Sequence, residues 1–124
     1  MNVAVVGASR DREKFGNKAV RAYHAHGHRV FPVNLREKEI EGLPAFRSVL
    51  QIPDPLDVVL VYVPPSVTLR LLPDLAKLAP KPKQLFLNPG SEDDAVIARA
   101  EELGLSPTLA CSIVAIGDSP ANYR

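Results

Sequence analysis

The sequence has one cysteine, no tryptophan and almost no excess charge. Fifteen Lys and Arg face 14 Asp and Glu, which gives a formal net charge of +1 at pH 7. The lone Cys111 excludes an internal disulfide framework and fits a reducing compartment, so we expect a cytoplasmic protein. Balanced charge supplies no concentrated basic field of the kind that nucleic acid or an anionic membrane needs. We therefore expect neither as a partner.

Long apolar runs are missing as well. No stretch approaches the roughly 20 apolar residues of a membrane span, and Met1 leads into a strand-like segment rather than a secretion signal. Hydrophobic residues nevertheless make up 46% of the 124, which is enough for the core of one domain. We expect residues 1–124 to form a single domain that ends in a short polar tail, 117–124.

Short apolar segments alternate with segments of helical spacing. Strands are predicted at 3–6, 29–33, 57–63, 84–87 and 108–110, and helices at 17–26, 66–78 and 91–103. Ser66 and Ser91 are the expected N-caps of the last two helices. The alternation is typical of an α/β fold. We predict a three-layer, Rossmann-like open sheet, mainly parallel, with about five strands and helices on both faces.

The first strand leads into a glycine turn and then into a helix. Val3–Val6 precede Gly7-Ala8-Ser9, and a polar segment connects these to Gly16-Asn17-Lys18. Backbone N–H groups at a helix N-terminus lack intrahelical partners, and the helix dipole adds positive potential there. The sequence therefore predicts a phosphorylated ligand over residues 7–9.

The order of the strands predicts where other groups join this loop. If the first two strands pair and the chain then crosses to the other side of the first strand for the strand at 57–63, the order in which strands are added reverses there. The switch point then lies between the first strand and the strand at 57–63. Ligands of open α/β sheets bind at such a point, beyond the carboxyl ends of the strands. The strand-end loops that meet there are 7–9, 34, 63–65, 89–90 and 111.

Two features argue against NAD as that ligand. The G-x-G-x-x-G fingerprint is missing after Gly7, and the second strand ends in Val33-Asn34 rather than in Asp or Glu. Basic residues surround the same rim instead: Arg10, Arg12, Lys14, Lys18 and Arg36. They suit a ligand with an additional ribose phosphate, NADP or coenzyme A, and equally a solvated loop, because Asp11 and Glu13 lie among them.

Five motifs occur together in an order that one family shares. They are Val3–Ser9, Pro32-Val33-Asn34, Val61–Pro65, Asn88-Pro89-Gly90 and the late Cys111. Together they resemble the small stand-alone CoA-binding proteins, whose fold is like the N-terminal CoA-binding domain of the succinyl-CoA synthetase α subunit and of ADP-forming acyl-CoA synthetases. The resemblance extends to about Ile116. It implies coenzyme A or an acyl-CoA as the ligand.

The resemblance also implies a role for each matching residue. The diphosphate would lie on Gly7, Ala8, Ser9 and Arg10, near the amides of Gly16, Asn17 and Lys18 and the basic Lys14. Val33 and Asn34 would flank the nucleoside, with Arg36 or Lys38 near the 3′-phosphate. Val63, Pro64 and Pro65 would form an apolar wall, Pro89 and Gly90 would approach the pantetheine, and Cys111 would lie near the thiol.

No catalytic set is evident on this rim. The only histidines, His24, His26 and His28, fall at a predicted helix end, where i and i+2 do not share a face. Neither a Ser/His/Asp set nor paired carboxylates nor metal-ligand spacing converges on the loops. We predict a CoA-binding module that is not an enzyme. The alternatives are an NADP-binding domain of a reductase and an interaction module regulated by its nucleotide pocket.

Overall fold

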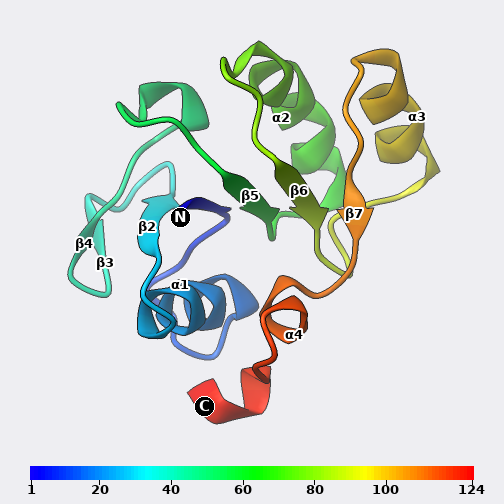
Figure 1. Cartoon of the computed structure of the whole chain (residues 1–124). Helices are drawn as coiled ribbons and strands as arrows, with labels where there is room; N and C mark the ends of the chain where they lie inside the picture. Colours follow the sequence, from blue (N-terminus) through cyan, green and yellow to red (C-terminus); the bar gives the residue numbers. More distant parts are fainter.

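A five-stranded parallel sheet lies between two layers of helices (Figure 1). The computed structural model describes every residue from Met1 to Arg124. The strands of the sheet are β1 (Asn2–Val6), β2 (Arg29–Val33), β5 (Val58–Val61), β6 (Gln84–Leu87) and β7 (Thr108–Leu109). Their spatial order is β2-β1-β5-β6-β7, and every pairing is parallel. The predicted α/β open sheet is confirmed, and its order reverses between β1 and β5.

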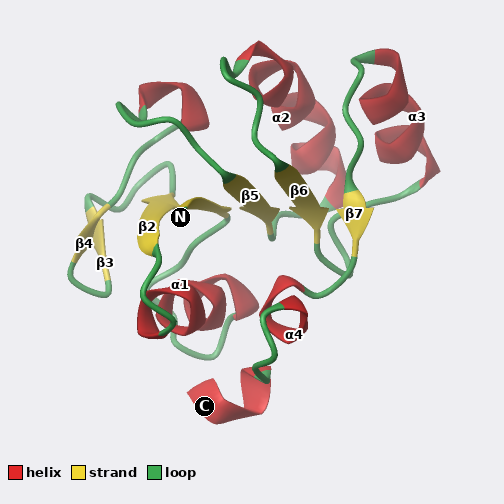
Figure 2. Cartoon of the chain, in the orientation of Figure 1, coloured by secondary structure: helices red, strands yellow, loops and turns green.

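The helices divide between the two faces of the sheet (Figure 2). One face carries α2 (Pro65–Lys77), α3 (Asp94–Glu102) and the 3-10 turn η1 (Val49–Gln51), and the other carries α1 (Phe15–Ala25) and α4 (Ser112–Ala115). A small hairpin, β3 (Glu39–Ile40) and β4 (Leu43–Pro44), lies beside β2. A second 3-10 turn, η2 (Pro120–Tyr123), closes the chain.

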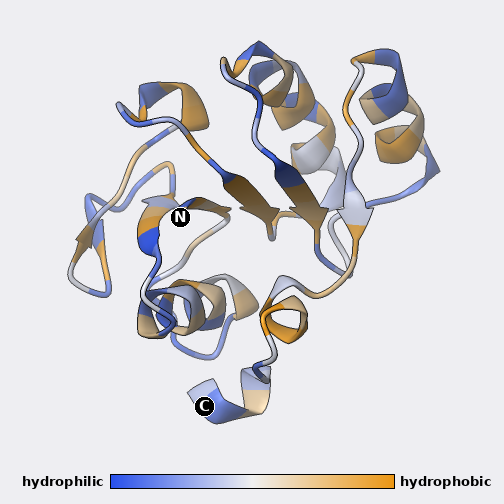
Figure 3. Ribbon diagram, in the orientation of Figure 1, coloured by the Kyte–Doolittle hydropathy of each residue, from blue (hydrophilic) through white to orange (hydrophobic).

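Alternating residues of each strand fill the two cores. Val3 and Val5 pack with the residues of α1, and Ala4 and Val6 pack with those of α2 and α3. All four residues of β5 are buried, as a central strand flanked by helices requires. Figure 3 shows this strand in the colour of the most hydrophobic residues. No helix of the chain has the length and apolarity that crossing a bilayer would demand.

Both predicted serine caps are wrong. Helix α2 begins one residue earlier than expected, with Pro64 as its N-cap and Pro65 in its first turn. Proline suits that position because its missing N–H would have no partner there. At α3 the cap is Asp93, whose Oδ1 accepts from the Val96 amide at 2.9 Å. Ser91 is buried instead and donates its hydroxyl to the carbonyl of Asn88.

The last eight residues are more than a polar tail. The turn η2 packs against α1, and the Arg21 guanidinium lies 5.6 Å from the centre of the Tyr123 ring. The Asp118 carboxylate lies 2.8 Å from His26 Nε2 at the end of α1. The segment 117–124 is therefore docked on the same face of the sheet as α1 and α4.

Candidate functional site

A cleft of about 710 Å³ opens at the carboxyl ends of β1, β5 and β6. The strand-end loops that were expected to meet at this edge all contribute to it. Its lining consists of Gly7, Ala8, Ser9, Lys14, Phe15, Gly16, Asn34, Tyr62, Val63, Pro64, Asn88, Pro89, Gly90, Ser91 and Cys111. The sequence analysis did not predict Phe15, Tyr62, Asn88 and Ser91 as site residues. Each lies within or beside a predicted strand or helix, where its residue type is also expected for structural reasons alone.

A second cleft, of about 370 Å³, lies on the other side of the tip of β1. It shares Gly7, Asn34 and Val63 with the first, so the two clefts meet at the loop after β1. Its remaining lining consists of Val6, Val33, Leu35, Arg36, Arg47, Val67 and Leu71. The predicted site residues Val33 and Arg36 thus lie in this smaller cleft, where Arg47 joins them.

The loop after β1 exposes its amides because its carbonyls are held from behind. The carbonyl of Ala8 accepts from Asn34 Nδ2 at 2.9 Å, and that of Ser9 accepts from Asn17 Nδ2 at 2.8 Å. In a trans peptide the N–H points opposite to the C=O. The amides of Ser9 and Arg10 therefore face away from these partners. The amides of Ala8, Ser9 and Arg10 donate to no acceptor within the chain.

The N-terminus of α1 is pressed directly against this loop. A Cβ built on Gly16 would lie 2.2 Å from the carbonyl oxygen of Gly7, so only glycine permits this approach. The amides of Phe15 and Gly16 also lack an acceptor in the chain. The N-cap Lys14 makes no side-chain cap, and the first turn holds no acidic residue. This end of α1 can therefore receive an anion.

Asn34 and Asn17 position the loop rather than line the cleft with free groups. Besides holding Ala8, Asn34 accepts with Oδ1 from the amides of Arg36 and Glu37 at 2.8 and 2.9 Å. An Asp or Glu in place of Asn34, as NAD-binding proteins have at the end of this strand, would set carboxylate lone pairs against the Ala8 carbonyl instead of donating to it. Asn17 is fully buried, and its Nδ2 donates to the Ser9 carbonyl and to the Glu41 carboxylate.

A buried polar network forms the base of the large cleft. Asn88 donates to the carbonyl of Val61 at 3.0 Å and accepts from the amide and hydroxyl of Ser112 at 2.8 and 2.9 Å. The hydroxyl of Tyr62 lies 2.7 Å from Ser112 Oγ, and that of Tyr23 donates to the Ser112 carbonyl at 2.7 Å. No buried side-chain polar atom of the chain lacks a partner. The network joins β5, β6, α1 and α4 beneath the cleft.

The tyrosines of this network predict a loss of stability in alkali. Burial raises the pKa of Tyr23 to about 12, and burial raises the pKa of Tyr62 as well. The neutral hydroxyls therefore stabilise the fold fully below pH 10, the ordinary pKa of tyrosine, and that contribution disappears as the pH rises toward the folded-state pKa. The loss of stability is measured by denaturation midpoints between about pH 8 and about pH 12, and tyrosine ionisation is followed by tyrosinate absorbance over the same range. Ionisation of all three tyrosines near pH 10 without unfolding would contradict it.

The basic residues of the rim are not equivalent. Arg10 lies 3.5 Å from Glu37 and Arg12 lies 3.6 Å from Glu41, both as exposed ion pairs. Lys18 lies over the Phe15 ring at 5.2 Å. Lys14 lines the large cleft, and Arg36 and Arg47 line the small one, without forming an ion pair.

Two further predicted residues have distinct places. Cys111 is a free, half-buried cysteine at the edge of the large cleft, directly before α4. Pro65 is the first residue of α2 and lies just outside the lining. The three histidines belong to the opposite end of the molecule, where His24 and His28 line a separate hollow at the amino end of β2.

The sequence matches one family over most of its length. A protein-family model described as "CoA binding domain" covers residues 1–116. The α subunit of an ADP-forming acetate–CoA ligase II from Pyrococcus furiosus is 40% identical over 63 residues, which are 50% of this chain and 14% of that subunit. An ADP-forming acetate–CoA ligase I from Archaeoglobus fulgidus is 37% identical over 79 residues, 64% of this chain and 10% of the ligase. The chain spans about a seventh or less of the length of these two relatives.

Solved structures show the same fold in chains of two sizes. A conserved hypothetical protein from Pyrococcus furiosus superposes with a TM-score of 0.83 at 32% identity, over 92% of this chain and 97% of that one. A dinucleotide-forming acetyl-coenzyme A synthetase from Ca. Korarchaeum cryptofilum gives a TM-score of 0.70 at 27% identity, over 88% of this chain and 25% of the synthetase. The chain described here belongs to the CoA binding domain family.

Proposed function

We propose that this chain binds coenzyme A or an acyl-CoA across the two clefts and catalyses no reaction itself. The observation that carries the proposal is the set of backbone amides at Ala8, Ser9, Arg10, Phe15 and Gly16 that have no acceptor in the chain. They lie where a β-strand, a glycine turn and a helix N-terminus meet, which is an arrangement suited to a diphosphate. Family membership makes coenzyme A the expected source of that diphosphate.

The two clefts suit the two unlike halves of the ligand. The small cleft offers apolar walls from Val33 and Leu71 for the adenine and two unpaired guanidinium groups, Arg36 and Arg47, for the 3′-phosphate. The large cleft offers Val63 and the prolines around it for the pantetheine arm. Cys111 lines the same cleft, and we place the thiol or acyl end of the ligand beside that residue.

The absence of catalysis is part of the proposal. The large cleft is lined by Lys14 as its one charged side chain and contains neither a histidine nor a carboxylate. The side chains that most often serve as general acid or base are thus not among its lining residues, and we assign no proton-transfer role to Lys14, Tyr62 or Cys111. The related ligases match this chain over only 14% and 10% of their own length. We propose a carrier, a sensor or the ligand-binding subunit of a larger assembly.

Thermal denaturation with separate additions of CoA, NADP and ATP tests the proposal. A ligand that binds only the folded state raises the midpoint by mass action. We expect CoA to raise it and ATP to leave it nearly unchanged. A rise with NADP that exceeds the rise with CoA would instead support the reductase interpretation.

The charge of the small cleft predicts selectivity for the 3′-phosphate. In an Arg36→Gln, Arg47→Gln double variant, CoA should bind about tenfold or more weakly, since each charge-assisted bond contributes about 1.5–3 kcal/mol before solvent screening. Dephospho-CoA should bind the variant and the wild type alike. Calorimetric titration measures the affinity of each protein for both ligands. Arg99→Gln, on α3 and far from the clefts, is the matched control, and an equal loss for both ligands would contradict the assignment.

A further inference from the structure

The segment 117–124 lies beyond the part of the chain that matches the family, yet its contacts lead back to the proposed diphosphate site. We propose that this segment fixes the loop after β1 through Arg21 and thereby sets the affinity of the cleft from the opposite side of α1. Arg21 and Tyr123 are positioning residues, because neither lines a cleft. The inference rests on the proposed function for one of its two readouts.

The segment is held in one conformation by Asp118. Its carboxylate accepts from the Tyr123 hydroxyl at 2.6 Å, from Asn122 Nδ2 at 2.8 Å and from the Ser119 amide at 2.7 Å, and it lies 2.8 Å from His26. These bonds, led by the one from Tyr123, hold the pKa of Asp118 well below its usual range. The carboxylate is thus ionised at neutral pH and keeps Tyr123 turned toward α1.

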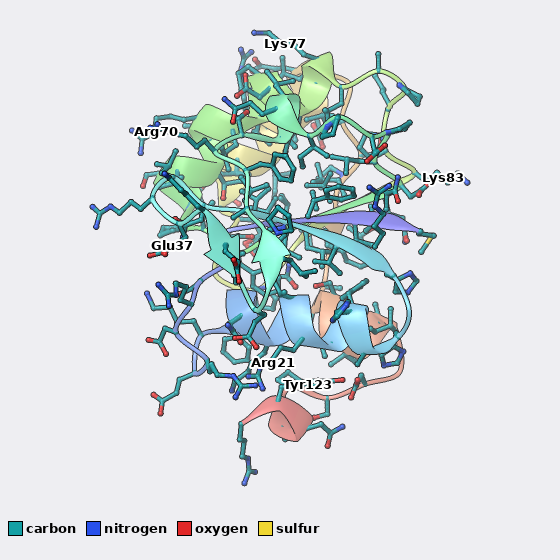
Figure 4. The ribbon with its side chains drawn as sticks, turned by 90° about the vertical axis from the view of Figure 1, so that its left-hand side faces the viewer. Arg21, Glu37, Arg70, Lys77, Lys83 and Tyr123 are labelled. Atoms are coloured by element: carbon teal, nitrogen blue, oxygen red, sulfur yellow. The ribbon has the colours of Figure 1, made fainter.

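Tyr123 in turn holds the side chain of Arg21. Its carbonyl accepts from Arg21 Nη2, and its ring lies 5.6 Å from the guanidinium carbon. In Figure 4 the two labelled residues lie next to each other, between α1 and η2. A guanidinium that stacks on a ring and donates to a carbonyl has few orientations left to it.

Arg21 passes this order on to the loop at two points. Its Nε donates to Asn17 Oδ1 at 2.8 Å, and its Nη2 also donates to the carbonyl of Arg12 at 3.0 Å. With its oxygen engaged, the amide of Asn17 must present its NH₂ group to the Ser9 carbonyl, which lies at 2.8 Å. One guanidinium therefore supports both ends of the segment between Ser9 and Arg12.

In Tyr123→Ala the ring no longer stacks on Arg21, and without the hydroxyl bond to Asp118 the carbonyl of residue 123 is no longer held against the guanidinium. Arg21 then keeps only its bonds to Asn17 and to the Arg12 carbonyl, and the bond that fixes the sense of the Asn17 amide weakens. The Ser9 carbonyl is then free to reorient, and with it the Arg10 amide that we assign to the diphosphate. Asn17 retains a second bond, from Nδ2 to Glu41 Oε2 at 3.2 Å, so the loop keeps part of its order. Loss of preorganisation weakens binding without removing a contact to the ligand.

The experiment compares Tyr123→Ala, Tyr123→Phe, Arg21→Ala and the Tyr123→Ala, Arg21→Ala double variant in the full chain. We expect CoA to bind Tyr123→Ala about tenfold more weakly, within the usual range of coupling between sites. Tyr123→Phe keeps the ring beside Arg21 and loses only the hydroxyl bond to Asp118, so its CoA affinity should lie between those of the wild type and Tyr123→Ala. The double variant should be no weaker than Arg21→Ala, because both changes act along one path.

A second readout does not depend on CoA. In the ligand-free protein, the amide resonances of Ser9 and Arg10 should shift in Tyr123→Ala and stay in place in Asn2→Ala, which removes an exposed hydrogen bond elsewhere. Unchanged loop resonances in Tyr123→Ala would overturn the inference, as would full CoA affinity of that variant beside a wild type that binds. If the wild type binds no CoA while the resonances shift, the proposed function fails and the positioning role stands.

Discussion

Alanine in place of Gly16 should destabilise the protein by about 2–4 kcal/mol and abolish CoA binding, even though the position is helical. At an ordinary site in a helix, glycine to alanine is stabilising by about 0.5–1 kcal/mol. Here the new Cβ would lie 2.2 Å from the Gly7 carbonyl oxygen and 3.3 Å from Ala8 Cα. Because the obstacle is backbone, either α1 or the loop after β1 must move. Chemical denaturation and calorimetric CoA titration measure the two effects.

Gly27→Ala is the matched control. Gly27 has φ +84°, and a Cβ added there would meet nothing within 4 Å, so its variant should cost about 1 kcal/mol of backbone strain and leave CoA affinity unchanged. Stability equal to or above the wild type in Gly16→Ala would show that the close approach is not real. Gly7→Val is a poorer probe, since φ +89° and a Cβ 3.0 Å from the Tyr62 carbonyl carbon make it a folding defect as well.

Asn88→Ala should cost about 3 kcal/mol of unfolding free energy and weaken CoA binding together with it. The substitution leaves the buried Ser112 amide without its acceptor and removes the donor to the Val61 carbonyl. The backbone carbonyl of residue 88 still accepts from Ser91, but the turn after β6 loses the side chain that ties it to β5 and α4. Pro89 and Gly90 on the wall of the large cleft would then lose their fixed position.

The half-buried Asn2 supplies the comparison for this experiment. Its side chain donates only to the carbonyl of Pro55, so Asn2→Ala should cost about 1 kcal/mol or less and leave CoA affinity intact. A loss in Asn88→Ala no greater than the loss in Asn2→Ala would show that the buried network contributes little. Retained CoA affinity in a destabilised Asn88→Ala would show that the turn after β6 is not part of the site.

Hydrophobic periodicity was sufficient to predict the sheet. The residues of β5 and of β1 are apolar almost without interruption, which is how strands buried on both faces read, and the order of the elements leaves few topologies for a parallel sheet. The switch point between these strands, and the loops around it, followed from the same pattern.

Side-chain hydrogen bonding could not be predicted in the same way. Ser91 and Asp93 are equally good caps in sequence, and only the packing of the turn after β6 buries the serine. Arg47 follows a short bridge to β2 and reaches the small cleft only because the chain folds back there. The docking of 117–124 depends on Arg21, a residue about a hundred positions away, for which no local pattern gives a signal.

Titration of isotopically labelled protein with CoA, followed through its backbone amide resonances, tests the central claim most directly. The account predicts that the largest shifts occur at Ala8, Ser9, Arg10, Phe15 and Gly16, the amides without an acceptor in the chain, with smaller shifts along both clefts. Saturable binding whose shifts spare these five amides would contradict it.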